Sequence, residues 1–160
     1  MVTWDFYLAN CVGVADDALF PSVFPIADPG VLVAAKREAY RTALEETPPI
    51  LAATVELLHE LSRHYTMAVV SSSARVEVEP PLVRTGVADC FRLIITREDV
   101  ERIKPNPEPY LKAARLLQAS RPLVIEDSPA GIAAGRAAGF QVVEVPNPAG
   151  MAGQLRTALG

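Results

Sequence analysis

Four short, β-rich apolar runs in the C-terminal part of the chain constrain its fold more than any other feature. They cover residues 66–70, 91–96, 122–125 and 141–145. Each run has the length of a buried strand, and helical patterns separate one run from the next. Strands that alternate with helices in this way form βαβ units, which build a parallel sheet. The sequence therefore predicts an α/β fold.

The N-terminal part has a different pattern. Residues 31–46 and 49–63 show helical spacing with little strand character, and the proline pair 48–49 separates them. Residues 1–30 have no sustained period. The expected organisation is a helical segment over residues 1–47 followed by an α/β core over residues 48–160. Two further helices are expected within that core, at residues 109–118 and 128–138.

Length and composition exclude several classes of protein. The chain has 160 residues, 50% hydrophobic and 21% charged, which suits one domain with a real core and not a disordered chain. The net charge of −4, with no basic cluster, predicts no nucleic-acid or membrane partner. No signal peptide is apparent, and the cysteines Cys11 and Cys90 are expected to be buried thiols, so a cytoplasmic location is predicted.

Polar residues follow three of the expected strands. Serines 71–73 come after the first strand, Lys104 follows the second through a short polar segment, and Glu126 with Asp127 ends the third. Ligands of parallel sheets bind beyond the carboxyl ends of the strands. The sequence thus gathers hydroxyls, an ammonium and two carboxylates at one edge of the sheet.

The acidic pair Glu126-Asp127 has two interpretations. Ser128 suits a helix N-cap, Pro129 the first helical position and Gly139 the position after the helix, so the acids complement a helix N-terminus. That role accounts for one carboxylate better than for two adjacent ones. Two like charges at the end of a buried strand favour a cation, and hard oxygen ligands suit Mg²⁺.

Ser71 and Lys104 also have two interpretations. A hydroxyl between a strand end and a helix N-terminus suits phosphate, although an N-cap serine has the same appearance. Lys104 lies in IKPNPEPY, where prolines stiffen the chain and fix the direction of the ammonium. An ordinary surface lysine is the alternative for that residue taken alone.

Together these segments resemble the haloacid dehalogenase superfamily of phosphohydrolases, in particular its β-phosphoglucomutase-like subgroup. VVSSSARVEVE is similar to the second motif of that family, IKPNPEPYLKAA to the third and VIEDSPAGIAAGRAAGF to the fourth. The resemblance covers residues from about 31 to 147. It implies a three-layer α/β/α core with a Rossmann-like parallel sheet, and a partial helical cap at the N-terminus.

The resemblance also implies site roles. Ser71 and Ser72 correspond to the phosphate-binding segment, Lys104 to the residue that holds the phosphoryl group, and Glu126 with Asp127 to the Mg²⁺ ligands.

Lys36, in AAKREAY, matches a cap region that contacts substrate in relatives. A solvated helix charge is the alternative for this lysine.

The first motif of the family is missing. That motif is a strand followed by DxDGT, whose first Asp is the nucleophile, and no DxD occurs in this sequence. Covalent phosphoryl transfer needs a carboxylate in line with phosphorus and a proton donor for the leaving oxygen. Asp5, in VTWDFYL, is a poor substitute because the second Asp, the Gly and the Thr are lacking. No catalytic residue is therefore assigned.

The missing motif also leaves a place in the sheet. In the resembled fold its strand lies between the strand that ends at Ser71 and the one that ends at Glu126. Three solutions are open: VTWDFYL fills the place, another chain supplies a strand, or the two halves close around the gap. An incomplete sheet favours association with a second copy or with a partner strand.

Two functions follow as hypotheses. The first is a Mg²⁺-dependent phosphatase or phosphomutase acting on a small phosphorylated metabolite, shortened at its N-terminus so that the nucleophile is lost. The second is a non-catalytic protein of the same descent that binds phosphate or Mg²⁺, or that interacts with a partner.

Overall fold

A computed structural model describes residues 16–23, 28–145 and 150–159. The chain divides into two compact units, Met1–Pro48 and Pro49–Gly160. The segment VTWDFYL and Cys11, which carried predictions, lie outside the described residues.

The second unit contains four parallel strands in two pairs. Strand β1 (Met67–Val70) pairs with β2 (Phe91–Ile95), and β3 (Leu123–Glu126) pairs with β4 (Gln141–Glu144). Across the part of the chain that the structure describes, no strand pairs with the other edge of β1 or of β3. The four predicted strands and their parallel order are confirmed.

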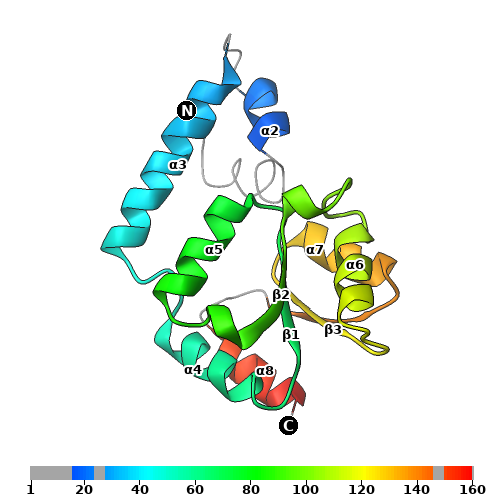
Figure 1. Ribbon diagram of the computed structural model, residues 1–160. Coiled ribbons are helices and arrows are strands. Elements are labelled where there is room, and N and C mark those ends of the chain that lie inside the picture. Colours follow the sequence, from blue (N-terminus) through cyan, green and yellow to red (C-terminus); the bar gives the residue numbers. More distant parts are fainter. Residues whose placement is uncertain (1–15, 24–27, 146–149, 160) are drawn as a thin grey trace. The chain divides into compact units, whose positions relative to one another are not determined.

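Helices cover both sides of these strands (Figure 1). Helix α5 lies on one side of β1 and β2, and α6 lies on the other. The helices of this unit are α4 (Ala52–Leu61), α5 (Arg75–Arg84), α6 (Glu108–Leu116), α7 (Pro129–Ala137) and α8 (Met151–Leu159), with 3₁₀ turns η1 (Ala88–Cys90) and η2 (Arg97–Asp99). The arrangement is the expected α/β/α layering.

Side chains alternate along β1 between two apolar clusters. Met67 and Val69 pack with residues of α4, α5 and β2, in the cluster whose buried members include Leu82 and Val87. Val70 packs on the opposite side with the cluster of α6, β3 and α7. The period of two in a strand explains this division. Because Val70 belongs to the cluster that contains β3, the end of β1 is tied to the second strand pair.

Helix α7 approaches its sheet closely through small residues. A Cβ added at Gly135 would lie 2.9 Å from Val142 Cγ2 and 3.1 Å from Val124 Cγ1. Ser128 caps the helix, since its Oγ accepts a hydrogen bond from Gly131 N at 3.1 Å. Gly139 follows the helix with a φ of +77°, a conformation that favours glycine. The cap at Ser128 and the position of Gly139 after the helix were predicted.

Other elements departed from the sequence predictions. Helix α5 contains Pro80 and Pro81, which remove two N–H donors from a short helix, and it was predicted only as a helix start. Helix α8 was not predicted. It is held to α4 by an ion pair between Arg156 and Glu60 at 2.6 Å, and its Leu155 is buried. Tertiary packing decided both helices.

The first unit contains helices α2 (Asp16–Val23) and α3 (Pro29–Glu46). Asp28 caps α3 by accepting a hydrogen bond from Gly30 N at 2.9 Å, and Pro29 occupies the first helical position. No residue of α3 is buried. Its assignment to a cap stays a prediction.

Cys90 is buried, as predicted, and its Sγ lies 3.3 Å from His59 Nδ1. No helix among the described residues is long and apolar enough to cross a membrane.

Candidate functional site

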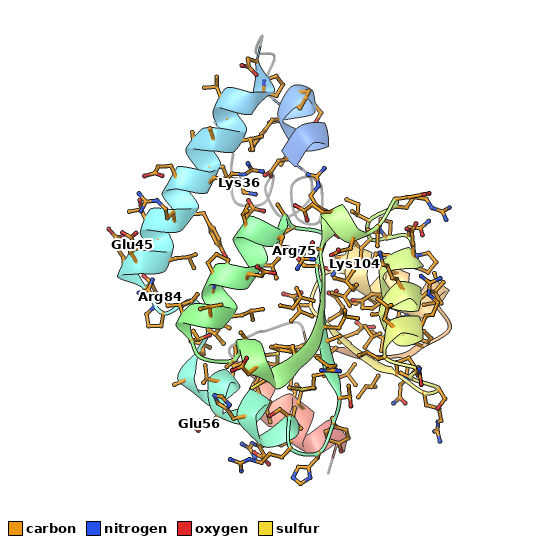
Figure 2. The ribbon with its side chains drawn as sticks, in the orientation of Figure 1. Lys36, Glu45, Glu56, Arg75, Arg84 and Lys104 are labelled. Carbon is orange, nitrogen blue, oxygen red and sulfur yellow. The ribbon has the colours of Figure 1, made fainter. Side chains whose placement is uncertain are left out.

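Lys104 joins the ends of β1 and β3. It lies between η2 and α6, and its side chain is 11% exposed (Figure 2). Its Nζ donates to Val70 O at 3.2 Å and to Glu126 Oε1, with which it also forms an ion pair. Val70 directly precedes Ser71. The structure thus brings three predicted site residues, Ser71, Lys104 and Glu126, to one edge of the strands.

The Glu126 carboxylate is buried and accepts five hydrogen bonds. Its Oε1 accepts hydrogen bonds from Lys104 Nζ and from the hydroxyl of Tyr110, the latter at 2.5 Å. Its Oε2 accepts hydrogen bonds from Asp127 N and Ser128 N, both at 3.2 Å, and from Ser128 Oγ at 3.0 Å. A carboxylate offers about four lone-pair positions, so its accepting capacity is used by the protein itself. Glu126 therefore serves the helix N-terminus, one of its two predicted roles.

The charge of Glu126 is stabilised despite its burial. Burial alone raises the pKa of this carboxyl, but the charge and hydrogen bond of Lys104, together with Tyr110 and Ser128 N, lower the pKa below its usual value. Burial first, and then the bond to Glu126, raise the pKa of Tyr110. The phenol therefore remains a neutral donor wherever Glu126 is charged.

Gly131 gives this carboxylate its space. A Cβ added at Gly131 would lie 2.0 Å from Glu126 Cδ. Tyr110 lies on the other side, where α6 places it among Val124 and Ala134. Sequence reasoning missed Tyr110 as a site residue. The sequence signal that could have identified Tyr110 is its position in IKPNPEPY. There it follows Lys104 by six residues and lies on the apolar face of a helix.

The end of β1 carries the serines. Ser71 N continues the strand pairing by donating to Ile95 O at 2.9 Å, and Ser71 Oγ accepts from Ser73 N at 3.1 Å. A hydroxyl both donates and accepts, so the Ser71 proton remains available to a ligand. Ser72 Oγ is buried without a hydrogen-bond partner among the described residues. Two hydroxyls therefore have unused donor capacity here.

The N-terminus of α5 is less open than its sequence suggested. Arg75 N donates to the Glu98 carboxylate, at 3.2 Å from Oε1 and 3.1 Å from Oε2. Ala74 N donates to Glu77 Oε2 at 3.2 Å. Two carboxylates thus already neutralise this helix terminus. The N–H groups of Ala74 and Arg75 are therefore already paired within the chain.

The two residues predicted to hold Mg²⁺, Glu126 and Asp127, differ in their surroundings. Glu126 is committed to five donors, one of them an ammonium. Asp127 is exposed, and its carboxylate makes no hydrogen bond or ion pair with a described residue. No group of three or more His, Cys, Asp or Glu suited to a metal occurs in the described ranges. Binding of Mg²⁺ by Glu126 and Asp127 therefore stays a prediction.

Lys36 lies in the first unit, on helix α3. Its Nζ contacts both carboxylate oxygens of Asp16, at 2.9 Å and 2.8 Å, and its side chain is 43% exposed. The ion pair ties α3 to α2. Contact with substrate stays a prediction for this lysine.

Comparison with known proteins identifies a family. The family model described as haloacid dehalogenase-like hydrolase matches residues 2–145. An uncharacterised protein of Haemophilus influenzae is 31% identical over 147 residues, covering 90% of this chain and 72% of that protein. The validoxylamine A 7'-phosphate phosphatase of Streptomyces hygroscopicus is 39% identical over 89 residues, covering 54% of this chain and 42% of that enzyme.

Solved structures show the same fold. The crystal structure of CbbY from Rhodobacter sphaeroides in complex with phosphate superposes with a TM-score of 0.77, at 22% identity, over 91% of this chain and 71% of that protein. A hydrolase from Streptococcus pneumoniae superposes with a TM-score of 0.62, at 26% identity, over 99% of this chain and 81% of that protein. The matched region covers a smaller share of the length of several curated relatives. For the validoxylamine phosphatase that share is 42%.

Proposed function

Because this chain belongs to the haloacid dehalogenase-like hydrolase family, we propose that its second unit binds the phosphate group of a small phosphate monoester. The observation that carries the proposal is the position of Lys104. Its ammonium is largely buried and reaches the ends of β1 and β3 together, beside the serines that follow β1. Buried ammonium and free hydroxyl donors match the oxygens of a phosphate.

The described residues supply binding and charge neutralisation. In the bound state Lys104 turns part of its donor capacity from Glu126 to the phosphate, and the hydroxyls of Ser71 and Ser72 donate to phosphate oxygens. These contacts neutralise charge that develops during phosphoryl transfer. Hydrolysis also needs a carboxylate nucleophile in line with phosphorus. Asp5, the substitute considered from sequence, lies outside the described residues.

Mg²⁺ and the β-phosphoglucomutase-like subgroup stay predictions. The Asp127 carboxylate is open to a cation, whereas Glu126 would have to release one of its donors. No step of the proposed function is assigned to a metal.

A second candidate function is phosphate binding without turnover. The observation that favours it is the commitment of Glu126: this carboxylate contacts Lys104, but its five donors leave it unavailable to attack phosphorus. The two candidates share the same binding residues and differ only in chemistry.

The experiment measures binding and turnover on the same pure protein. Inorganic phosphate is titrated by calorimetry with and without Mg²⁺, and p-nitrophenyl phosphate turnover is followed in parallel. Lys104→Met is the test variant, and Lys112→Met is the control, since Lys112 donates to the backbone oxygen of Asp99 instead. Thermal unfolding confirms that both variants are folded.

We expect millimolar or tighter phosphate binding, weakened at least about tenfold in Lys104→Met, which corresponds to about 1.4 kcal/mol. Equal affinity in both variants, or no binding by the wild type, would refute the proposal. Turnover that Asp127→Asn abolishes would decide for the phosphatase. Binding without turnover would decide for the non-catalytic function.

A further inference from the structure

We propose that Tyr110 is a positioning residue that controls how readily Lys104 releases Glu126 and reaches an anion. This inference rests on the proposed phosphate-binding function. The hydroxyl of Tyr110 and the ammonium of Lys104 donate to the same atom, Glu126 Oε1. Tyr110 therefore acts through Lys104 and does not itself touch the ligand.

The geometry of Tyr110 couples it to both charged groups. Its hydroxyl lies 2.5 Å from Glu126 Oε1, and Lys104 Nζ lies 5.7 Å from the centroid of its ring. Residue Tyr110 is 8% exposed, and the side chains of Lys104 and Glu126 are 11% and 7% exposed. Water therefore has little room to replace the phenol as a donor. The three side chains form one buried, hydrogen-bonded cluster.

The consequence follows from sharing one acceptor. A charged oxygen that already accepts a strong hydrogen bond attracts a second donor less strongly than a bare oxygen does. The phenol therefore weakens the hold of Glu126 on the ammonium. When Lys104 turns to a phosphate, Tyr110 and the Ser128 donors still satisfy the carboxylate, so releasing Lys104 does not leave a buried charge unsolvated.

Removing only the hydroxyl separates this role from packing. In Tyr110→Phe the ring keeps its apolar neighbours Val124 and Ala134, but Glu126 Oε1 is left with Lys104 alone. The ammonium is then bound more tightly within the protein and is less available to an anion. Phosphate affinity should fall even though no phosphate contact has been removed.

The test compares the full-length wild type with Tyr110→Phe and with Tyr65→Phe, a control at an exposed tyrosine. Two quantities are measured: the dissociation constant of inorganic phosphate, and the NMR signal of Lys104 Nζ with its hydrogen-exchange rate, assigned by its loss in Lys104→Met. We expect Tyr110→Phe to weaken phosphate binding about fivefold, the scale of one modest hydrogen bond. Exchange at Lys104 Nζ in the free protein should also become slower.

Each outcome decides between the alternatives. Unchanged or tighter phosphate binding in Tyr110→Phe would overturn the inference, as would an Nζ signal and exchange rate equal to those of the wild type. A purely structural role would lower the melting temperature and leave both readouts unmoved. If the wild type binds no phosphate, the proposed function fails, and the Nζ exchange rate of the free protein still tests the control of Lys104 by Tyr110.

Discussion

The ends of β1 and β3 lie at the same edge of the second unit, yet they differ in how far their polar groups are paired within the chain. At the end of β3, Glu126 accepts five hydrogen bonds and the first turn of α7 is capped by Ser128. At the end of β1, Ser72 Oγ is buried without a partner among the described residues, and the Ser71 hydroxyl still has a proton to donate. Lys104 connects the two ends.

This difference separates support from binding. A polar group whose capacity is used by its own chain holds the structure together, whereas a buried hydroxyl with unused capacity costs free energy unless a ligand or water completes it. The end of β3 therefore stabilises the fold, and the end of β1 has the unused donors on which the proposed phosphate binding depends. Disruption of the first should mainly lower the free energy of unfolding, and disruption of the second should mainly weaken anion binding.

The largest effect is expected from Gly131→Ala. The new Cβ would lie 2.0 Å from Glu126 Cδ, so the carboxylate must move and its bonds to Lys104 and Tyr110 must break. Overpacking and an unpaired buried charge together should cost about 4 kcal/mol of unfolding free energy. Urea denaturation measures this loss. Gly153→Ala in α8, where a Cβ meets nothing within 4 Å, is the control and should be neutral or stabilising.

A smaller and pH-dependent effect is expected from Glu126→Gln. The folded pKa of Glu126 is lowered, so its charge contributes stability above the unfolded value near 4.5, and this contribution is lost as the pH falls below that value. At neutral pH the variant should be less stable than the wild type by about 3 kcal/mol, because Lys104 loses its buried partner. The difference should narrow in acid. A gap that stays constant from neutral to acid pH would contradict the assigned role of the ion pair.

The smallest effect on stability is expected from Ser72→Ala. Its buried hydroxyl has no described partner, so its removal should change the unfolding free energy by less than about 1 kcal/mol, in the stabilising direction. Phosphate affinity should fall about fivefold if this hydroxyl binds the ligand. Ser73→Ala, at an exposed serine, serves as the control. A clear loss of stability without loss of affinity would reverse the distinction between the two strand ends.

Much of the fold could be predicted because it depends on local patterns. The four strands, the cap at Ser128 and the left-handed Gly139 all follow from short-range rules about alternation, capping and backbone freedom. Helix α5 contains two prolines, which short-range rules do not expect inside a helix, and α8 depends on contact with α4. Neither helix could therefore be predicted in full. Local propensity is a weak guide wherever tertiary packing decides.

The sequence by itself determined which chemical groups gather at the edge of the strands, because parallel strands place their carboxyl ends together. It therefore identified Ser71, Lys104 and Glu126. Only the tertiary structure decided how these groups are used. It pairs Lys104 with Glu126, adds Tyr110 from α6 and leaves Ser72 without a partner among the described residues. Hydrogen-bond capacity is divided among neighbours in space, and a linear pattern carries no record of that division.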